Sequence, residues 1–302
     1  MLFRSTYTQS GGSAEHWSSA RTFQLSPLVR VGENIRTSRS NDPSKEKGEV
    51  WDVPTLKGEV ILPPTCAKGE ASVGERTLPF LPQPTLDPTY LQDGWKRVAL
   101  GACALESGYF VLGTQDDPKD AALKAVLASP DTLIVEVRDN HWTGPSDNWL
   151  VDDHVELWLS PRPPQQLSGC GALAAADKPE QWAIRIADSK VFPAYGSPKR
   201  TLQVDKVEMR EAGALVGYRL KVGLPTGFGG ISVLYSDSDS GKKQERLLAT
   251  SALKFGRSET FNVVRPVAPT EASCVARGGS LEIVPAPLHV QGPDISALAP
   301  PG

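Results

Sequence analysis

A short polar stretch between two apolar runs carries the residues best suited to bind a ligand. It holds Trp149 and Trp142 together with Asn148, Asp152 and His141. A pyranose ring presents a face of C–H groups that stacks on an exposed indole, while amides and carboxylates bond to its hydroxyls. We therefore expect these residues to form a carbohydrate-binding loop. The alternative is that the tryptophans fold over a sheet edge and cap the core, as buried aromatic side chains do.

Acidic residues in and around the same stretch suggest a cation site. Asp139, Asp153 and Glu156 carry carboxylate oxygens, the ligands that calcium prefers when several converge from loops. They are the expected metal ligands, and the expected ion is a structural calcium. The alternative, which we favour, is that Asp153 bonds to the backbone of its own turn while Glu156 pairs with an arginine on the next strand.

Residues for catalysis are not recognisable in the sequence. It contains no G-x-S-x-G, H-E-x-x-H, G-x-x-x-x-G-K-[ST] or G-x-G-x-x-G motif. The four histidines are scattered without the spacing of metal ligands. We therefore expect a protein that is not an enzyme, with no catalytic residue and no cofactor other than the calcium ion.

Alternation of apolar and polar residues on either side of the stretch predicts two strands that hold it. The runs are residues 132–137 and 155–159. In the second run Val and Leu alternate with Glu156 and Trp158, which is the period of a strand with one buried face. We expect Trp158 to pack on the opposite face, against the linker or the N-terminal region. Residues 121–127 fit either a strand or a short helix.

The composition sets the broad class of the protein. The chain has 302 residues, a net charge of −3, 27 glycines and 26 prolines. Many short apolar runs separated by Gly and Pro are typical of antiparallel β-sandwiches, so the expected fold class is all-β. Without a surplus of positive charge, the chain does not suit nucleic acid or anionic lipid. The longest apolar run, Val98 to Leu105, is too short to span a bilayer, so we expect no membrane insertion.

The distribution of prolines and short strands predicts four parts of the chain. Residues 1–66 are a β-rich region that looks like part of a larger domain, and within it residues 37–48 form an exposed loop. Residues 67–93 are a Pro-rich linker or an extended wrap over a neighbouring surface. Residues 94–286 form the β-sandwich, and residues 287–302 form a loosely ordered tail.

The stretch from residue 136 to residue 159 resembles the family-9 carbohydrate-binding modules and the wider DOMON-like β-sandwiches. In those proteins a strand ending in Asp leads through a loop to a Trp, then to an Asp and a Val-Glu strand. Here Asp139, Trp149, Asp153 and Glu156 match those positions. The late strand ending in Pro and the strand with an acidic turn are matched by residues 217–225 and 233–239. The resemblance covers roughly residues 106–265.

The resemblance implies a non-catalytic carbohydrate-binding module of an exported protein, with a sugar stacked on Trp149. Metal binding occurs among the family-9 modules, so it also favours the calcium site. Two departures matter: one extra residue separates Trp149 from Asp153, and residues 247–251 lack the second aromatic of the sugar-clamping modules. The alternative is therefore a structural or protein-interaction β-sandwich that has lost the sugar site and docks on another domain or surface protein.

The cysteines and the start of the chain bear on its location. Cys66, Cys103, Cys170 and Cys274 are widely spaced and form no C-x-x-C pair. Four cysteines allow three disulfide pairings, and the sequence does not choose among them. No signal peptide is visible in this chain, so the protein is either cytosolic or exported by a signal that this chain lacks. The resemblance implies an extracellular or periplasmic protein.

Overall fold

The structure is a computed structural model in which nearly every described segment is a strand. It describes residues 2–10, 15–25, 28–39, 42–52, 57–62, 66–86, 88–98, 100, 104–114, 117, 120–196, 198–267, 273–277 and 280–284. Side chains are described for residues 58–62 and for those positions from 66 to 267. Within this part of the chain, no helix is long and apolar enough to cross a membrane. The predicted all-β class is confirmed.

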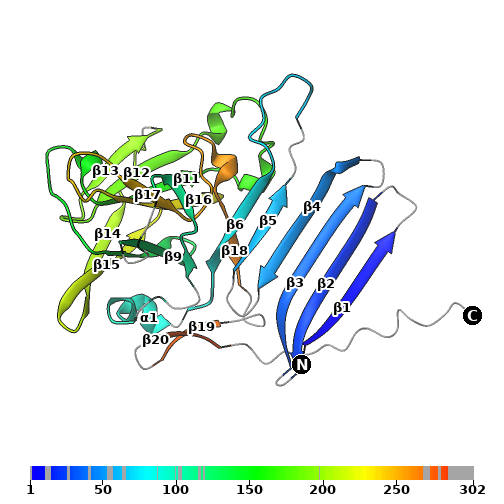
Figure 1. Cartoon of the computed structure of the whole chain (residues 1–302), viewed down its shortest axis with the longest axis horizontal. Helices are drawn as coiled ribbons and strands as arrows, with labels where there is room; N and C mark the ends of the chain where they lie inside the picture. The colour runs from blue at the N-terminus through cyan, green and yellow to red at the C-terminus, as the bar shows by residue number, and fades with distance from the viewer. Residues whose placement is uncertain are drawn as a thin grey trace, which may run out of the picture.

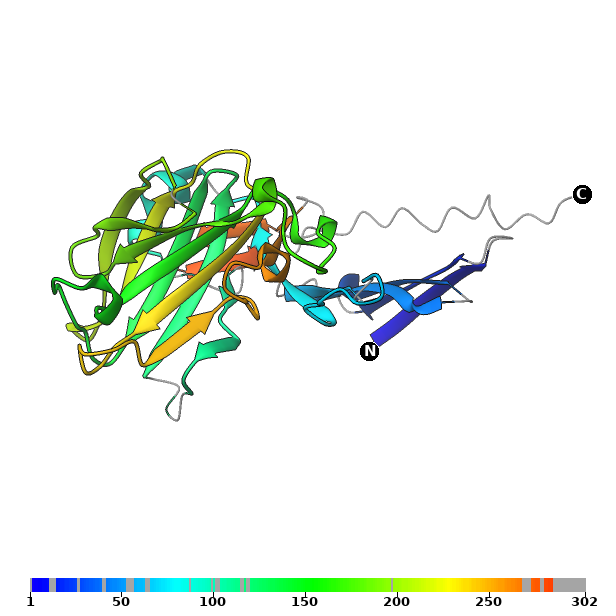
Figure 2. The ribbon, with the colours of Figure 1, turned by 90° about the horizontal axis from the view of Figure 1, so that it is seen from above.

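Two antiparallel sheets pack face to face in the C-terminal half and form a β-sandwich (Figure 2). One sheet has the order β14 (Gln203–Glu211), β15 (Ala214–Gly223), β10 (Thr132–Asp139), β9 (Ala121–Ser129) and β7 (Leu105–Glu106). Opposite it lie β18 (Asn262–Pro266), β16 (Gly230–Asp237), β11 (His154–Ser160), β12 (Glu180–Arg185) and β13 (Val191–Tyr195). Strand β17 (Arg246–Ala249) also pairs with β16 and carries β8 (Tyr109–Leu112) on its other side. Residues 121–127 are therefore a strand and not a helix.

The core lies between the two sheets and follows the alternation expected from the sequence. On β11, Val155, Leu157 and Leu159 are at most 5% exposed and face the other sheet. They meet Leu133 and Val135, which alternate in the same way on β10. Because each buried Val or Leu side chain contributes roughly 1.5–3 kcal/mol, this inner layer supplies much of the stabilisation of the sandwich.

The outer face of each sheet is also covered. Trp158, on the outer face of β11, is 3% exposed and lies against Phe255 and Phe261, with Tyr195 beside it. The expected packing of Trp158 on the linker or N-terminal region was therefore wrong, because residues 253–261 fold back over this face. On the outer face of the five-stranded sheet, α1 (Pro88–Gln92) and the following turn bury Tyr90 and Trp95.

The N-terminal strands extend one sheet of the sandwich (Figure 1). They form an antiparallel meander that reaches the sandwich through β6 (Arg76–Gln83), which pairs with β5 and runs parallel to β18. Its strands are β1 (Leu2–Ser10), β2 (Glu15–Leu25), β3 (Leu28–Arg39), β4 (Asp42–Asp52) and β5 (Lys57–Leu62). Residues 37–48, expected as a loop, lie mostly in the β3–β4 hairpin, because cross-strand pairing outweighs the polar composition there. A further hairpin, β19 (Ser273–Arg277) and β20 (Ser280–Val284), forms a separate two-stranded sheet.

The proline-rich segment 67–93 is more structured than a linker. Strand β6 lies within it and is buried along most of its length. Its prolines leave carbonyl groups available, and the oxygen of Pro79 accepts a hydrogen bond from Asn262 Nδ2 at 3.1 Å. Residues 86–95 do wrap over a neighbouring surface, the outer face of the five-stranded sheet. The four-part division of the chain stays a prediction, and its tail, residues 287–302, lies outside the described residues.

A disulfide ties the segment before β6 to the sandwich. Cys66 and Cys170 are bonded across a sequence separation of 104 residues. Backbone hydrogen bonds flank the disulfide, from Val73 N to Gly169 O at 3.0 Å and from Gly171 N to Ala71 O at 2.8 Å. The side chains of Cys103 and Cys274 lie outside the described part of the structure.

Truncation of an inner-face residue tests the sandwich core. We expect Leu157→Ala to lower the free energy of unfolding by about 2–5 kcal/mol, because it removes buried atoms and leaves a cavity between the sheets. The measurement is urea denaturation, and Leu150→Ala is the matched control, since Leu150 is 47% exposed. Equal effects of the two substitutions would contradict the layered core.

Candidate functional site

The loop that carries the predicted sugar contacts closes one end of the sandwich. It leaves β10 in the five-stranded sheet and enters β11 in the facing sheet, so residues 140–153 cross from one layer to the other. The turn after β16 lies beside this loop. A Cβ atom placed on Gly241 of that turn would lie 3.9 Å from the methyl group of Thr143 in the loop. This end of the molecule is therefore built from loops held by strands of both sheets.

Two buried aspartates fix the loop at its two ends. Asp139 accepts a hydrogen bond from the backbone N–H of His141 at 2.9 Å and another from the Tyr235 hydroxyl at 2.5 Å. Asp153 is fully buried and accepts from Thr143 N at 2.6 Å and from Ser238 N at 3.0 Å. Asp153 therefore bonds to the backbone of its own loop, as the favoured alternative expected, and also holds that loop against the neighbouring turn.

Asp152 holds the middle of the loop and is 1% exposed. Its Oδ2 accepts from Ser146 N at 3.0 Å and from Arg185 Nη1 at 3.1 Å. Burial alone would raise the pKa of the Asp152 carboxyl, but hydrogen bonds from Ser146, and after them the hydrogen bond and charge of Arg185, hold this pKa below its usual value. A Cβ on Gly144, which has φ +100°, would lie only 3.0 Å from the Asp152 carboxyl carbon. Asp152, expected as a sugar contact, thus serves as an internal support.

Trp149 stands on the surface of this loop and is partly exposed. It begins a 3-10 turn, Trp149–Val151, whose preceding residue Asn148 accepts a hydrogen bond from Leu150 N at 3.2 Å. The indole lies edge-on to His154 at 5.1 Å between ring centroids and stacks on Phe192 at 5.8 Å with an interplanar angle of 20°. One face of the indole is thus covered by Phe192, and His154 contacts the indole in an edge-on geometry.

The other predicted contacts divide into two groups. Asn148 is exposed and adjoins Trp149, and His141 is exposed nearer the start of the loop. Trp142 turns inward and packs edge-on against Tyr218 at 4.7 Å, so it caps the core as the alternative interpretation expected. No ring contact joins Trp142 to Trp149 in the described part of the chain.

A cluster of buried carboxylates lies directly beneath the loop. Oxygens of Asp139, Asp153 and Asp237 all lie within 4.8 Å of one another. Asp237 also belongs to a second group, with Asp120 and Asp239, and Arg246 pairs with all three members of that group. The Oδ1 atom of Asp237 is buried and has no hydrogen-bond partner among the described residues.

Burial makes the cluster costly to ionise. Loss of hydration raises the pKa of Asp139 to about 8, and the neighbouring carboxylates Asp237 and Asp153 add to the shift. The pKa of Asp237 rises to about 6, chiefly through burial, although Arg246 counteracts the rise. Burial also raises the pKa of Asp153. A bound cation would favour the ionised forms of all three.

Glu156, the third predicted metal ligand, lies elsewhere. It is on the outer face of β11 and accepts hydrogen bonds from Gln181 Nε2 at 2.7 Å and Trp158 Nε1 at 3.1 Å. Gln244 Nε2 and His154 lie near its other oxygen, at 3.3 and 3.5 Å. The expected metal role of Glu156 is therefore wrong: successive strand residues face opposite sides of the sheet, and Glu156 faces away from the other two predicted ligands. The expected pairing of Glu156 with an arginine is also wrong, because its partners are the four residues just named.

Two residues of the site were not predicted from the sequence. Phe192 comes from β13 and reaches Trp149 only because β13 pairs with β12 beside β11. Asp237 joins the cluster because β16 pairs with β11, with His154 opposite Ser236. The acidic composition of residues 237–239 was a signal for Asp237, but only the strand pairing brings it next to Asp153.

Comparisons with known proteins give a structural likeness. No family model and no curated protein sequence matches the chain. A family-9 carbohydrate-binding module from Caldicellulosiruptor kristjanssonii in complex with cellotriose is 14% identical, with a TM-score of 0.40, over 58% of this chain and 85% of that one. A structure of such a module from the same organism in complex with glucose is 12% identical, with a TM-score of 0.39, over 58% and 88%.

The carboxylate cluster predicts how stability depends on pH in the absence of divalent cations. The unfolded chain loses the Asp139 proton near pH 4, whereas the folded chain keeps it until about pH 8. The unfolded state therefore binds fewer protons in this window, and the free energy of unfolding should fall as pH rises through it.

Urea denaturation in a chelating buffer at pH 5 and pH 8 measures this effect. Asp139→Asn should show a smaller fall between the two pH values than the parent, and Asp147→Asn, an exposed residue of the same loop, should leave it unchanged. If the free energy of unfolding falls equally in Asp139→Asn and in the parent, the raised pKa of Asp139 is contradicted.

Proposed function

We propose that this protein is a non-catalytic carbohydrate-binding module in which a sugar stacks on Trp149. The observation that carries the proposal is the placement of Trp149, a partly exposed indole on a loop that buried carboxylates hold in a fixed conformation. A rigid platform binds more tightly than a flexible one, because less conformational freedom is lost on binding. The resemblance of residues 136–159 to the family-9 carbohydrate-binding modules agrees with this proposal.

The polar partners of the sugar come from residues beside the indole. The exposed Asn148 uses its oxygen to cap the 3-10 turn, while its amide nitrogen has no partner among the described residues and can donate to a hydroxyl. His141 offers a second exposed polar group on the same loop. In this proposal Trp142 and Asp152 act from inside, by setting the conformation of the loop.

The arrangement supports one-sided stacking in place of a clamp. Trp149 and Phe192 lie 5.8 Å apart between centroids and contact each other, which leaves no room for a sugar ring between them. Strand β17 has the sequence Arg-Leu-Leu-Ala, so it offers no tryptophan that could lie opposite Trp149. We therefore expect affinities in the millimolar range, roughly −4 kcal/mol.

The same stacking favours a second candidate function, a structural or protein-interaction module. Trp149 is already packed on Phe192 and His154, as it would be if it only stabilised the loop. In that case the exposed apolar side chains of the sandwich, such as Phe255 at 57% and Leu150 at 47%, would meet another domain or a surface protein. Sugar titration separates the two functions.

A structural calcium ion is part of the proposal. The residues present fit such an ion, because Asp139, Asp153 and Asp237 bring carboxylate oxygens together and Asp237 Oδ1 lacks a hydrogen-bond partner in the described structure. Asp139 and Asp153 form no ion pair there, so a cation would balance charge that burial makes costly. The ion would join β10, the loop before β11 and β16.

Export from the cytosol completes the proposal. The Cys66–Cys170 disulfide supports it, because such bonds persist in oxidising compartments and are rare in the cytosol. An extracellular or periplasmic location would also bring the protein to polysaccharide substrates of other enzymes. Treatment with a reductant should lower its thermal stability, since the bond closes a long loop.

Calorimetric titration with glucose, cellotriose and a panel of other soluble saccharides tests the sugar site. We expect binding at millimolar concentration and a loss of about tenfold or more in Trp149→Ala, because the indole supplies the stacking face. Phe255→Ala, an exposed aromatic on another face, is the matched control and should bind as the parent does. If no sugar binds, or Trp149→Ala binds as well as the parent, the interaction module is the better description.

Thermal unfolding with calcium and with a chelator tests the ion. We expect calcium to raise the melting temperature of the parent, more strongly at pH 8 than at pH 5, because the ligands must lose their protons. Asp237→Asn should remove most of the difference between the two conditions, whereas Asp147→Asn should keep it. A melting temperature that is the same in chelator and in calcium would contradict the proposed calcium site.

A further inference from the structure

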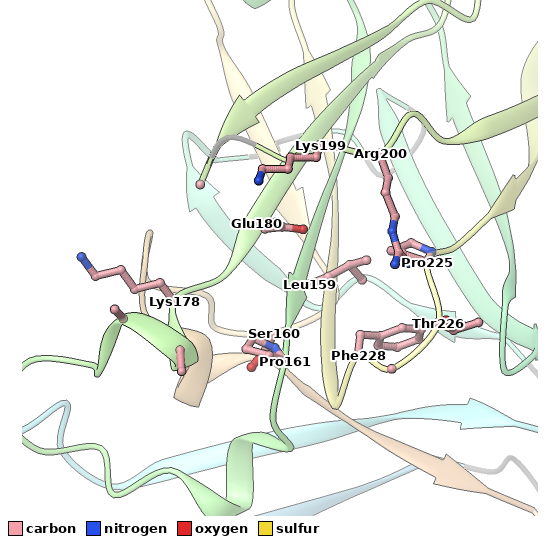
Figure 3. Close-up of a pocket in the computed structure, with 14 residues that line it drawn as sticks. Leu159, Ser160, Pro161, Lys178, Glu180, Lys199, Arg200, Pro225, Thr226 and Phe228 are labelled. Carbon is pink, nitrogen blue, oxygen red and sulfur yellow. The ribbon is translucent and has the colours of Figure 1, made fainter.

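A pocket at the opposite end of the sandwich has the features of a second ligand site (Figure 3). Its volume is about 640 Å³, which lies in the range of small-molecule sites in proteins. Strand β11 begins at the Trp149 loop and ends at this pocket, where Leu159 and Ser160 form part of its wall. The remaining walls come from the turn 175–178, the start of β12, the connection between β13 and β14, and the turn 225–228 between β15 and β16.

The walls of the pocket are held in place by buried and paired groups. Asp177 accepts two hydrogen bonds from Arg162, each of 2.5 Å, and its carbonyl accepts another from Ser258 Oγ at 2.8 Å. On the other side, the indole of buried Trp182 donates to the carbonyl of Arg200 at 2.9 Å. The backbone that presents the pocket is therefore fixed before any ligand arrives.

The chain approaches itself closely at the base of the pocket. A Cβ on Gly229 would lie 2.3 Å from the carbonyl carbon of Arg162, so only glycine fits there. This contact, with the hydrogen bond from Gly229 N to Ser160 O at 2.7 Å, brings the 225–228 turn against the end of β11. The Phe228 ring is placed at the pocket by that packing.

The charges that line the pocket are mostly positive and unpaired. Lys178, Lys199 and Arg200 line the pocket together with one carboxylate, Glu180, which leaves an excess of two positive charges. Among the described residues, the side chains of these four form no hydrogen bond or ion pair, while Arg162 nearby is neutralised by Asp177. Positive charge gathered in a concave site attracts anions. The chain as a whole has a net charge of −3, so this local excess runs against its overall balance.

An apolar surface lies beside these cations. Figure 3 shows the Arg200 guanidinium directed toward Pro225, on the side of the pocket where the Phe228 ring lies. Leu159 and Pro161 continue this surface. An aromatic ring with aliphatic neighbours suits the C–H face of a sugar ring, and a guanidinium suits a carboxylate through paired hydrogen bonds.

We propose that this pocket binds an acidic saccharide of the uronic-acid class, with its carboxylate on Arg200 and its ring against Phe228. An inorganic anion would use only the cations, and a neutral sugar would use only the apolar surface. A uronic acid uses both. The site is separate from the Trp149 loop, so it stands whether or not that loop binds a sugar.

Calorimetric titration at low salt with trigalacturonic acid, its methyl ester and inorganic phosphate tests the proposal. We expect the acid to bind about tenfold more tightly than the uncharged ester and than phosphate, because only the acid offers both a carboxylate and a ring. Arg200→Ala should lower the affinity for trigalacturonic acid by a similar factor. Glu180→Gln should raise that affinity, because it removes a negative charge from the pocket.

Two further variants serve as controls. Lys242→Ala removes an exposed cation from the turn beside the Trp149 loop, at the other end of the molecule, and should leave binding of the acid unchanged. Trp149→Ala should also leave it unchanged, which separates this site from the proposed neutral-sugar site. Four results would overturn the proposal: no binding of the acid at millimolar concentration, equal binding of acid and ester, binding of phosphate as tight as that of the acid, or an unchanged affinity in Arg200→Ala.

Discussion

Hydrogen bonds from loop amides to buried carboxylates are the interaction on which one end of this protein depends. His141, Thr143 and Ser146 each donate a backbone N–H to an aspartate within the sandwich. Burial of a carboxylate is unfavourable unless donors replace the lost water, so the loop and the acids stabilise each other. The surface position of Trp149 follows from this arrangement, because the turn that carries it has little freedom once Asp152 and Asp153 are bonded.

The same carboxylates leave an electrostatic imbalance inside the fold. Arg185 balances Asp152 and Arg246 balances Asp237, but Asp139 and Asp153 have no cationic partner among the described residues. Without a metal ion, the cluster must either keep protons or weaken the fold as pH rises. The proposed calcium ion would relieve this imbalance, since oxygen atoms from two strands and a loop converge there.

Strand β11 runs between the two ends of the sandwich, one of which carries the acidic cluster and the other the basic pocket. Its inner face packs in the core, its first residues meet the acidic cluster and Trp149, and its last residues line the basic pocket. Residues 253–261 and 88–98 cover the outer faces of the sheets and bury Trp158 and Trp95, so the sheet faces themselves offer little free surface. Ligand binding is therefore expected at the ends, where loops from both sheets meet.

The sequence by itself determined the all-β class, the alternation on β10 and β11, and the position of the loop between them, because strand periodicity is a local property. It also indicated the Trp149 loop and two of the three clustered aspartates. Only the tertiary structure decided that Trp142 and Asp152 lie inside, that Glu156 faces away from the cluster, and that Phe192 and Asp237 join the site. Those outcomes depend on which strands pair and in which register, and pairing is fixed by long-range packing that composition and spacing do not encode. For the same reason the basic pocket, assembled from five separate segments of the chain, leaves no continuous motif in the sequence.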